Sequence, residues 1–94
     1  MININGKALV TLTVKEGEEY CVQYEDNYSV NIVNGTDGAI NISSDGTFDD
    51  KDGAGYYLTL PKGCSYNGYN HMHITNRLYI KANAAGKVCI AIWR

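Results

Sequence analysis

The sequence predicts an all-β fold, a β-sandwich or jelly-roll-like barrel of about eight strands built from two similar four-stranded halves. Two observations predict it. Apolar and polar residues alternate with a period of two along the chain, whereas no capped window shows apolar residues at helical spacing. The chain also repeats its own pattern, and one half cannot bury both faces of its strands alone. Two such halves packed together are the expected folding unit.

The repeat is visible in two stretches of each half. The string at 12–20 has the pattern of the string at 58–66, which lies 46 residues further on. The string at 30–42 has the pattern of the string at 78–90, at an offset of 48 residues. One half therefore carries an insertion of two residues. We expect a single domain over residues 1–94, with pseudo-repeats at about 8–47 and 55–94.

The first half begins with an alternating stretch at 8–14, followed by a polar turn at 15–18. Alternation at 20–24 predicts the next strand. A hairpin over 30–42 completes this half, because its turn at 35–38 is rich in residues that tolerate positive φ.

Residues 43–55 form the longest polar stretch and join the two halves. The segment at 45–53 has the acid density of a calcium loop, but it lacks the regular D-x-D-x-D-G spacing and the terminal Glu. We expect a solvated linker there. His71 and His73 share one side of a strand, and a symmetric trimer would bring six such nitrogens together for a metal ion. Two surface histidines are the simpler interpretation, so no metal ion and no cofactor are expected.

The second half begins with a strand at 56–60, which ends at Pro61 because proline has no amide hydrogen for a β-ladder. A strand at 78–80, a turn at 83–86 and a last strand at 88–93 follow. Both faces of the last strand are apolar, which is typical of a central strand or of a subunit contact. The residues predicted to form that contact are Cys89, Ala91 and Trp93. The predicted core consists of Val10, Leu12, Val14, Val30, Ile32, Ile40, Ile42, Leu58, Leu60, Ile80, Val88 and Ile90.

Composition argues against several classes of function. The net charge is −2 and the Lys and Arg residues form no cluster, so a nucleic-acid ligand is not expected. The N-terminus does not have the pattern of a signal peptide and no apolar run is long enough for a membrane span. We therefore expect synthesis in a cytosol and three buried free thiols, Cys21, Cys64 and Cys89, without a disulfide. No recognisable nucleophile setting is present, so an enzyme is not expected.

One aromatic and amide cluster suggests a binding site: Tyr66, Asn67, Tyr69, Asn70 and His71. Aromatic rings stacked on sugar faces, with amides bonding hydroxyl groups, hold carbohydrate in many β-sandwiches. The same mixture occurs in protein interfaces, and tyrosines paired across strands are more often part of the packing. The cluster therefore fits a carbohydrate site and also fits a protein contact or internal packing.

The string "LYIKA", a small turn with glycine, a Val/Ile strand and a terminal Arg follow one another over 77–94. With the "Y-x-x-L-P-x-G" string at 57–63, this part resembles small all-β structural proteins of tailed bacteriophages, and the resemblance covers roughly the last 40 residues of this chain. The resemblance implies a non-enzymatic head-decoration or accessory protein, assembled in the host cytoplasm and located in the virion. It would bind capsid or tail subunits and form a homo-oligomer, a trimer by preference, because icosahedral capsids offer three-fold positions. The alternative is a carbohydrate-binding, lectin-like module, which a virion can also carry.

Overall fold

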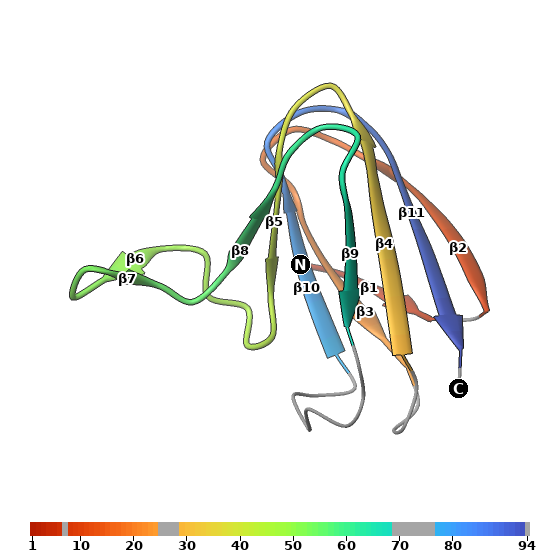
Figure 1. The fold of residues 1–94 in the computed structure, drawn as a ribbon, viewed down its shortest axis with the longest axis horizontal. Helices are drawn as coiled ribbons and strands as arrows, with labels where there is room; N and C mark the ends of the chain where they lie inside the picture. Colours follow the sequence, from red (N-terminus) through yellow and green to blue (C-terminus); the bar gives the residue numbers. More distant parts are fainter. Residues whose placement is uncertain (7, 25–28, 69–76, 94) are drawn as a thin grey trace.

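Two β-sheets face each other in the computed structural model, which describes residues 1–6, 8–24, 29–68 and 77–93 (Figure 1). The chain in these ranges forms strands and contains no helix, so it also offers no helix that could cross a membrane. The strands are β1 (Ile2–Asn5), β2 (Leu9–Val14), β3 (Glu19–Gln23), β4 (Ser29–Thr36), β5 (Ile40–Ser43), β6 (Asp50–Lys51), β7 (Ala54–Gly55), β8 (Leu58–Leu60), β9 (Ser65–Gly68), β10 (Arg77–Ala82) and β11 (Gly86–Trp93). The all-β prediction is confirmed.

The two halves of the chain exchange strands between the sheets. One sheet has the order β1-β3-β10-β5-β8, and the other has the order β2-β11-β4-β9. If β2, β3, β4 and β5 are matched with β8, β9, β10 and β11, the order β3-β10-β5-β8 becomes β9-β4-β11-β2. That is the second sheet read backwards. Each strand and its counterpart therefore lie in opposite sheets, and the two four-stranded halves interlock in one core.

The pairing register follows the same correspondence. Ile80 lies opposite Tyr20 in one sheet, and Ile32 lies opposite Tyr66 in the other. These pairs match at offsets of 48 and 46 residues, as the sequence pattern predicts. The strands β2 and β8 differ from that pattern, as the ladders that these two edge strands form show.

The ladders match β2 to β8 at an offset of 48. Leu60 lies opposite Ile40, and Leu12 lies opposite Val88, so Leu12 is the counterpart of Leu60. The sequence pattern had aligned Leu12 with Leu58. The first half therefore has two more residues than the second between this pair of strands and the next pair, β3 and β9. The second half in turn has two more residues between β9 and β10 than the first half has between β3 and β4.

The core lies between the sheets and consists of alternating apolar side chains. Its buried apolar residues are Leu12, Val14, Tyr20, Val22, Val30, Ile32, Ile40, Ile42, Leu60, Leu78, Ile80, Ala82, Val88, Ile90 and Ile92. The predicted core is confirmed except at two positions: Val10 is only partly buried and Leu58 is 45% exposed. Both are on edge strands, opposite Ile90 and Ile42, and are counterparts of each other. An edge strand has no outer neighbour to cover its side chains.

The linker contains structure that the sequence prediction missed. β6 and β7 pair as a small antiparallel ribbon that extends away from the sandwich (Figure 1). Asp52 and Gly53 connect them with φ angles of 55° and 78°, and an Asp-Gly pair with two positive φ angles favours a tight hairpin turn. β1 was not expected either, and it pairs in parallel with β3 at the edge of the five-stranded sheet.

The cysteine prediction is only partly right. All three are free thiols, and Cys21 is buried, but Cys64 and Cys89 are exposed. Cys89 lies on the central strand β11, between β2 and β4. A two-layer sandwich covers only the inner face of such a strand, which explains why an apolar position stays exposed.

Candidate functional site

Alternation along the four-stranded sheet leaves a second face that points away from the core. Val30, Ile32 and Asn34 of β4 are buried, and the residues between them lie on the outside. The same holds for β11, where Val88 and Ile90 are buried. We call the outer side of this sheet the uncharged face, defined by Leu9, Thr11, Thr13, Ser29, Asn31, Val33, Ser65, Asn67, Cys89, Ala91 and Trp93. Lys87, at one end of β11, lies on the same outer side between Thr13 and Gly35 and places a charge at the edge of this face.

The register joins the apolar members of the uncharged face into neighbouring rows. Cys89 lies between Thr11 and Val33, and Ala91 lies in the next row of β11. Leu9 is 82% exposed, Trp93 is 45% exposed and Val33 is 39% exposed. Contiguous exposed apolar side chains are typical of an interaction surface in a soluble protein.

Ala91 lies between Leu9 and Asn31, and Trp93 lies opposite Ser29. The residues predicted as a subunit contact, Cys89, Ala91 and Trp93, therefore run along the middle of the uncharged face. Sequence reasoning missed Leu9 and Val33. The signal was available, because both sit at the outward positions of their own alternating strands.

The predicted aromatic and amide cluster is divided by the sheet. Tyr66 packs against the core, whereas its neighbour Asn67 is exposed on the outer side. Successive residues of a strand point to opposite faces, so the two side chains cannot act together. Asn31 Nδ2 donates hydrogen bonds to Asn67 Oδ1 and to the Tyr66 carbonyl, the latter at 3.4 Å. Tyr69, Asn70 and His71, with His73, lie outside the described residues.

The outer face of the five-stranded sheet has a different character. Its residues include Glu19 opposite Lys81, and Arg77 at the end of β10. Charged side chains such as these favour exposure to water. The two outer faces therefore differ in charge, and the five-stranded sheet is also covered in part by the chain itself.

The covering segment is the turn that follows β5. The Ser43 hydroxyl accepts hydrogen bonds from the backbone N–H of Gly46 and of Thr47, each at 3.1 Å. Gly46 lies against the ring of Tyr79, since a Cβ there would be 3.4 Å from that ring. Asp45 Oδ1 accepts from Thr47 N at 2.9 Å and from the Ser43 hydroxyl at 2.8 Å, and these bonds lower the pKa of Asp45. Asp45 therefore stabilises the turn.

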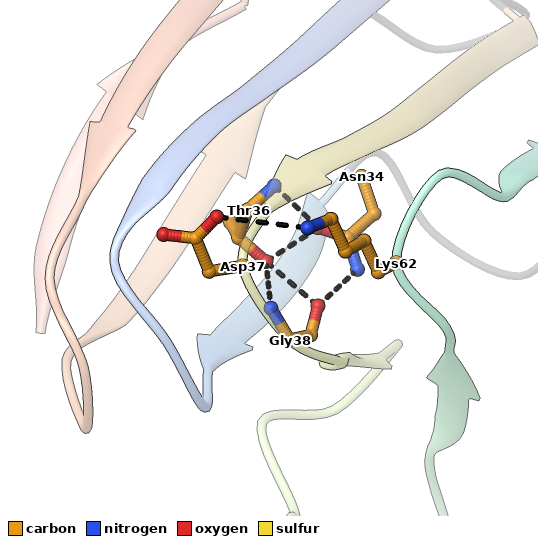
Figure 2. A network of polar contacts seen from close by, with 5 residues as sticks. All are labelled: Asn34, Thr36, Asp37, Gly38 and Lys62. Carbon is orange, nitrogen blue, oxygen red and sulfur yellow. Dashed lines mark hydrogen bonds and ion pairs between the residues drawn. The ribbon is translucent and has the colours of Figure 1, made fainter.

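A polar network lies at one corner of the sandwich, and Figure 2 shows its side chains. Asn34 Nδ2 donates to the carbonyls of Gly38 at 2.8 Å and Leu60 at 2.9 Å. Its Oδ1 accepts from the Thr36 backbone at 2.9 Å and from the Thr36 hydroxyl at 2.6 Å. Every polar atom of this buried amide has a partner. The network is therefore a structural joint between β4, β5 and β8.

An ion pair lies at the surface of the same corner, with 3.7 Å between Lys62 Nζ and Asp37 Oδ1. Its side chains are 65% and 87% exposed. Water screens such a pair, and pairs of this kind contribute about 0 to 1 kcal/mol. It adds little to the buried network.

Two tyrosines have raised pKa values, for different reasons. Burial raises the pKa of Tyr24, and the nearby Tyr66 raises it further. The hydrogen bond that Tyr57 donates to Asp50 at 2.8 Å raises the pKa of Tyr57. In the part of the chain that the structure describes, no group of three or more His, Cys, Asp or Glu side chains could hold a metal ion.

No protein-family model matches the sequence, and no curated protein matches it either. Solved structures are similar in fold. An RmlC-like cupin protein from Desulfovibrio desulfuricans has a TM-score of 0.64 and 21% identity, over 90% of this chain and 69% of its own. A de novo designed double-stranded β-helix has a TM-score of 0.57 and 21% identity, over 93% and 97%.

A third structure is PliG from Aeromonas hydrophila, a periplasmic inhibitor of g-type lysozyme. It has a TM-score of 0.52 and 7% identity, over 97% of this chain and 96% of its own. Identities this low carry the fold and no function. The exchange of strands between two facing sheets agrees with these neighbours, and the chain has a jelly-roll-like, double-stranded β-helix fold.

Proposed function

We propose that the protein is a non-enzymatic structural component of a tailed-phage virion that binds neighbouring subunits through the uncharged face. The observation that carries the proposal is the exposure of apolar side chains across neighbouring strands of that face, with Leu9 82% exposed and Trp93 45% exposed. A small domain gains little by leaving such residues in water, and burial of apolar area drives most protein association.

The composition of the face supports a protein partner. Aromatic and apolar residues are enriched in the centres of protein interfaces and charged residues are depleted there. Trp93 and Val33 are of the first kind, and within the described strands of this sheet Lys87 is the charged residue on the outer side. Asn31 and Asn67 border the apolar rows and supply amide groups of the kind found at the rims of interfaces.

The virion part of the proposal rests on the resemblance over 57–63 and 77–94. The fold by itself does not decide between functions, because one architecture hosts many. Cupin proteins, a lysozyme inhibitor and a designed protein share features of it. The exposed apolar residues of the uncharged face favour a subunit contact over a catalytic site.

The test is co-sedimentation of the purified protein with phage particles prepared without it. Val33→Lys places a charge in the middle of the uncharged face, and we expect it to weaken particle binding by about tenfold or more. Thr59→Lys is the matched control, because it adds the same charge at an exposed position of the five-stranded sheet. We expect the control to bind as the unmodified protein does.

Two results would overturn the proposal. One is an unmodified protein that does not sediment with the particles. The other is binding that Val33→Lys leaves unchanged. A glycan array then decides for the carbohydrate-binding alternative if it shows binding that Asn67→Ala removes.

A further inference from the structure

β2 is an edge strand whose outer backbone groups are uncovered. It ends the order of the four-stranded sheet and pairs only with β11. The Ile92 N–H donates to the Ala8 carbonyl at 3.0 Å, which sets the phase of this antiparallel ladder. Hydrogen-bonded and non-bonded pairs alternate, so Leu9, Thr11 and Thr13 direct their N–H and C=O groups away from β11. Among the described residues, no backbone hydrogen bond reaches these three groups from outside the sheet.

The counterpart edge in the other sheet is closed to pairing. β8 has three residues where β2 has six. Because Leu60 is the counterpart of Leu12, Pro61 occupies the position that Thr13 has in β2. Proline has no N–H to offer, and proline and short strands are common protections of sheet edges. β2 has no proline and no charged residue. The chain therefore protects one of two equivalent edges and leaves the other open.

We propose that β2 pairs with the β2 strand of a second copy of this chain, antiparallel about a two-fold axis at Thr11. The inference rests on the proposed function and names one of its partners. In this register Thr11 faces Thr11 of the second copy, and Leu9 faces Thr13. All three outward-directed residues then meet outward-directed residues, so each free N–H and C=O group finds a partner.

The side chains suit the same register. Val10 faces Leu12 of the second copy on the inner side, which covers the one inward residue of β2 that remains partly exposed. Leu9, the most exposed large apolar side chain at 82%, gains a neighbour on the outer side. The strand has no charge, so no like charges meet across the axis. The two uncharged faces join into one continuous surface, and the predicted assembly is a dimer in place of the expected trimer.

The first test substitutes Thr13→Pro, which gives β2 the residue that its counterpart has at this position. The Thr13 N–H points away from β11, so the substitution leaves the ladder within the chain intact. Analytical ultracentrifugation should find a dimer of the unmodified protein, and dimerisation about tenfold or more weaker for Thr13→Pro. Circular dichroism checks that the variant keeps its β spectrum.

The second test is independent of whether that variant folds. Thr11→Cys, with Cys64 and Cys89 replaced by Ser, should form a disulfide-linked dimer on mild oxidation. The two Thr11 Cα atoms would lie about 5.5 Å apart, within the range that a disulfide spans. Thr59→Cys in the same background is the matched control, because Thr59 is the counterpart of Thr11 on the closed edge β8.

A monomeric unmodified protein, or equal cross-linking at Thr11 and Thr59, overturns the inference. So does a dimer that Thr13→Pro leaves unchanged. A monomer that still sediments with phage particles rejects the β2 contact alone and leaves the proposed function standing. A dimer that fails to bind the particles rejects the proposed function alone.

Discussion

Two corresponding corners of the molecule use the same backbone and different side chains. The turn between β2 and β3 places the Gly17 N–H 2.8 Å from the Ala82 carbonyl, and the turn between β8 and β9 places the Gly63 N–H 2.8 Å from the Asn34 carbonyl. The two glycines have φ angles of 81° and 77°, which other residues adopt at a cost. In each corner, therefore, a hydrogen bond from the N–H of a turn glycine to the carbonyl of a residue in a neighbouring strand holds the backbone in place.

The side chains of Asn34 and Ala82 differ although both are fully buried. Ala82 fills its space with a methyl group, whereas Asn34 binds the carbonyls of Gly38 and Leu60 and accepts two hydrogen bonds from Thr36. The strands explain why, because β4 continues past Asn34 to Thr36 and β10 ends at Ala82. The comparison shows that the same backbone arrangement can hold a buried amide side chain when each polar atom of that amide has a hydrogen-bond partner.

The largest expected effect is that of Asn34→Ala, which gives this corner the side chain of its counterpart. The substitution removes the side-chain donor of the Leu60 carbonyl, whereas the Gly38 carbonyl keeps the Thr36 hydroxyl at 2.8 Å. Net hydrogen bonds contribute about 0.5 to 1.5 kcal/mol each and an unpaired buried group costs about 1 to 3 kcal/mol, so we expect a loss of about 2 to 4 kcal/mol. Urea unfolding followed by circular dichroism measures it. Thr36→Val, which removes only the hydroxyl of this network, should cost less, and a loss no greater for Asn34→Ala would contradict this account.

A smaller loss of stability is expected for a substitution at Gly86 than for Asn34→Ala, and the counterpart of Gly86 is Gly38. Gly86 has a φ of 145°, and a Cβ there would lie 2.6 Å from Thr36 Cα. At Gly38 a Cβ would lie 3.1 Å from the Ala84 Cβ, and φ is not in the positive range. We expect Gly86→Ala to cost about 1 to 3 kcal/mol or more and Gly38→Ala clearly less, by thermal unfolding of the two variants side by side. Equal losses would show that the two hairpin turns are equivalent after all.

The smallest effect concerns Ser43, where β5 ends, and its counterpart Ala91 inside β11. After Ser43 the chain turns on hydrogen bonds to Asp45, whereas β11 runs on past Ala91. The hydrogen bond from the Thr47 backbone N–H, together with the bond from the Ser43 hydroxyl, holds the pKa of Asp45 below its ordinary value of 3.8. The folded state therefore favours the carboxylate, and its contribution to stability is present above pH 3.8 and is lost as the pH falls through the lower folded pKa.

Asp45→Asn should make the stability of the protein less dependent on pH in that acid range. Urea midpoints at neutral pH and below pH 3.8 measure the difference. Asp49→Asn is the control, because it removes the same charge from a nearby exposed residue. A change in pH dependence that is as large for the control would argue against the turn as its cause.

Much of the fold follows from local pattern. Alternation along 8–14 and 88–93 marks strands and selects the residues that are buried, because the two faces of a strand are set by neighbouring residues alone. Pro61 ends its strand for an equally local reason, since it lacks the N–H that a ladder needs. The candidate subunit residues Cys89, Ala91 and Trp93 follow from the same alternation.

Tertiary structure alone decides which strands are neighbours. Leu58 and Leu60 have the same local pattern and lie on the same edge strand, yet Leu58 is 45% exposed and Leu60 is 5% exposed, so their burial depends on what the assembled sheets place against each side chain. Cys89 is exposed because a two-layer sandwich covers one side of β11 and nothing within the described chain covers the other. Tyr66 and Asn67 are adjacent in sequence and separated by the sheet. The sequence alone determined the strands and their inward faces, since these depend on neighbouring residues. Which strands lie at the sheet edges, which strands correspond to each other and which sheet face stays open depend on contacts between distant segments. Only the assembled sheets decide these contacts.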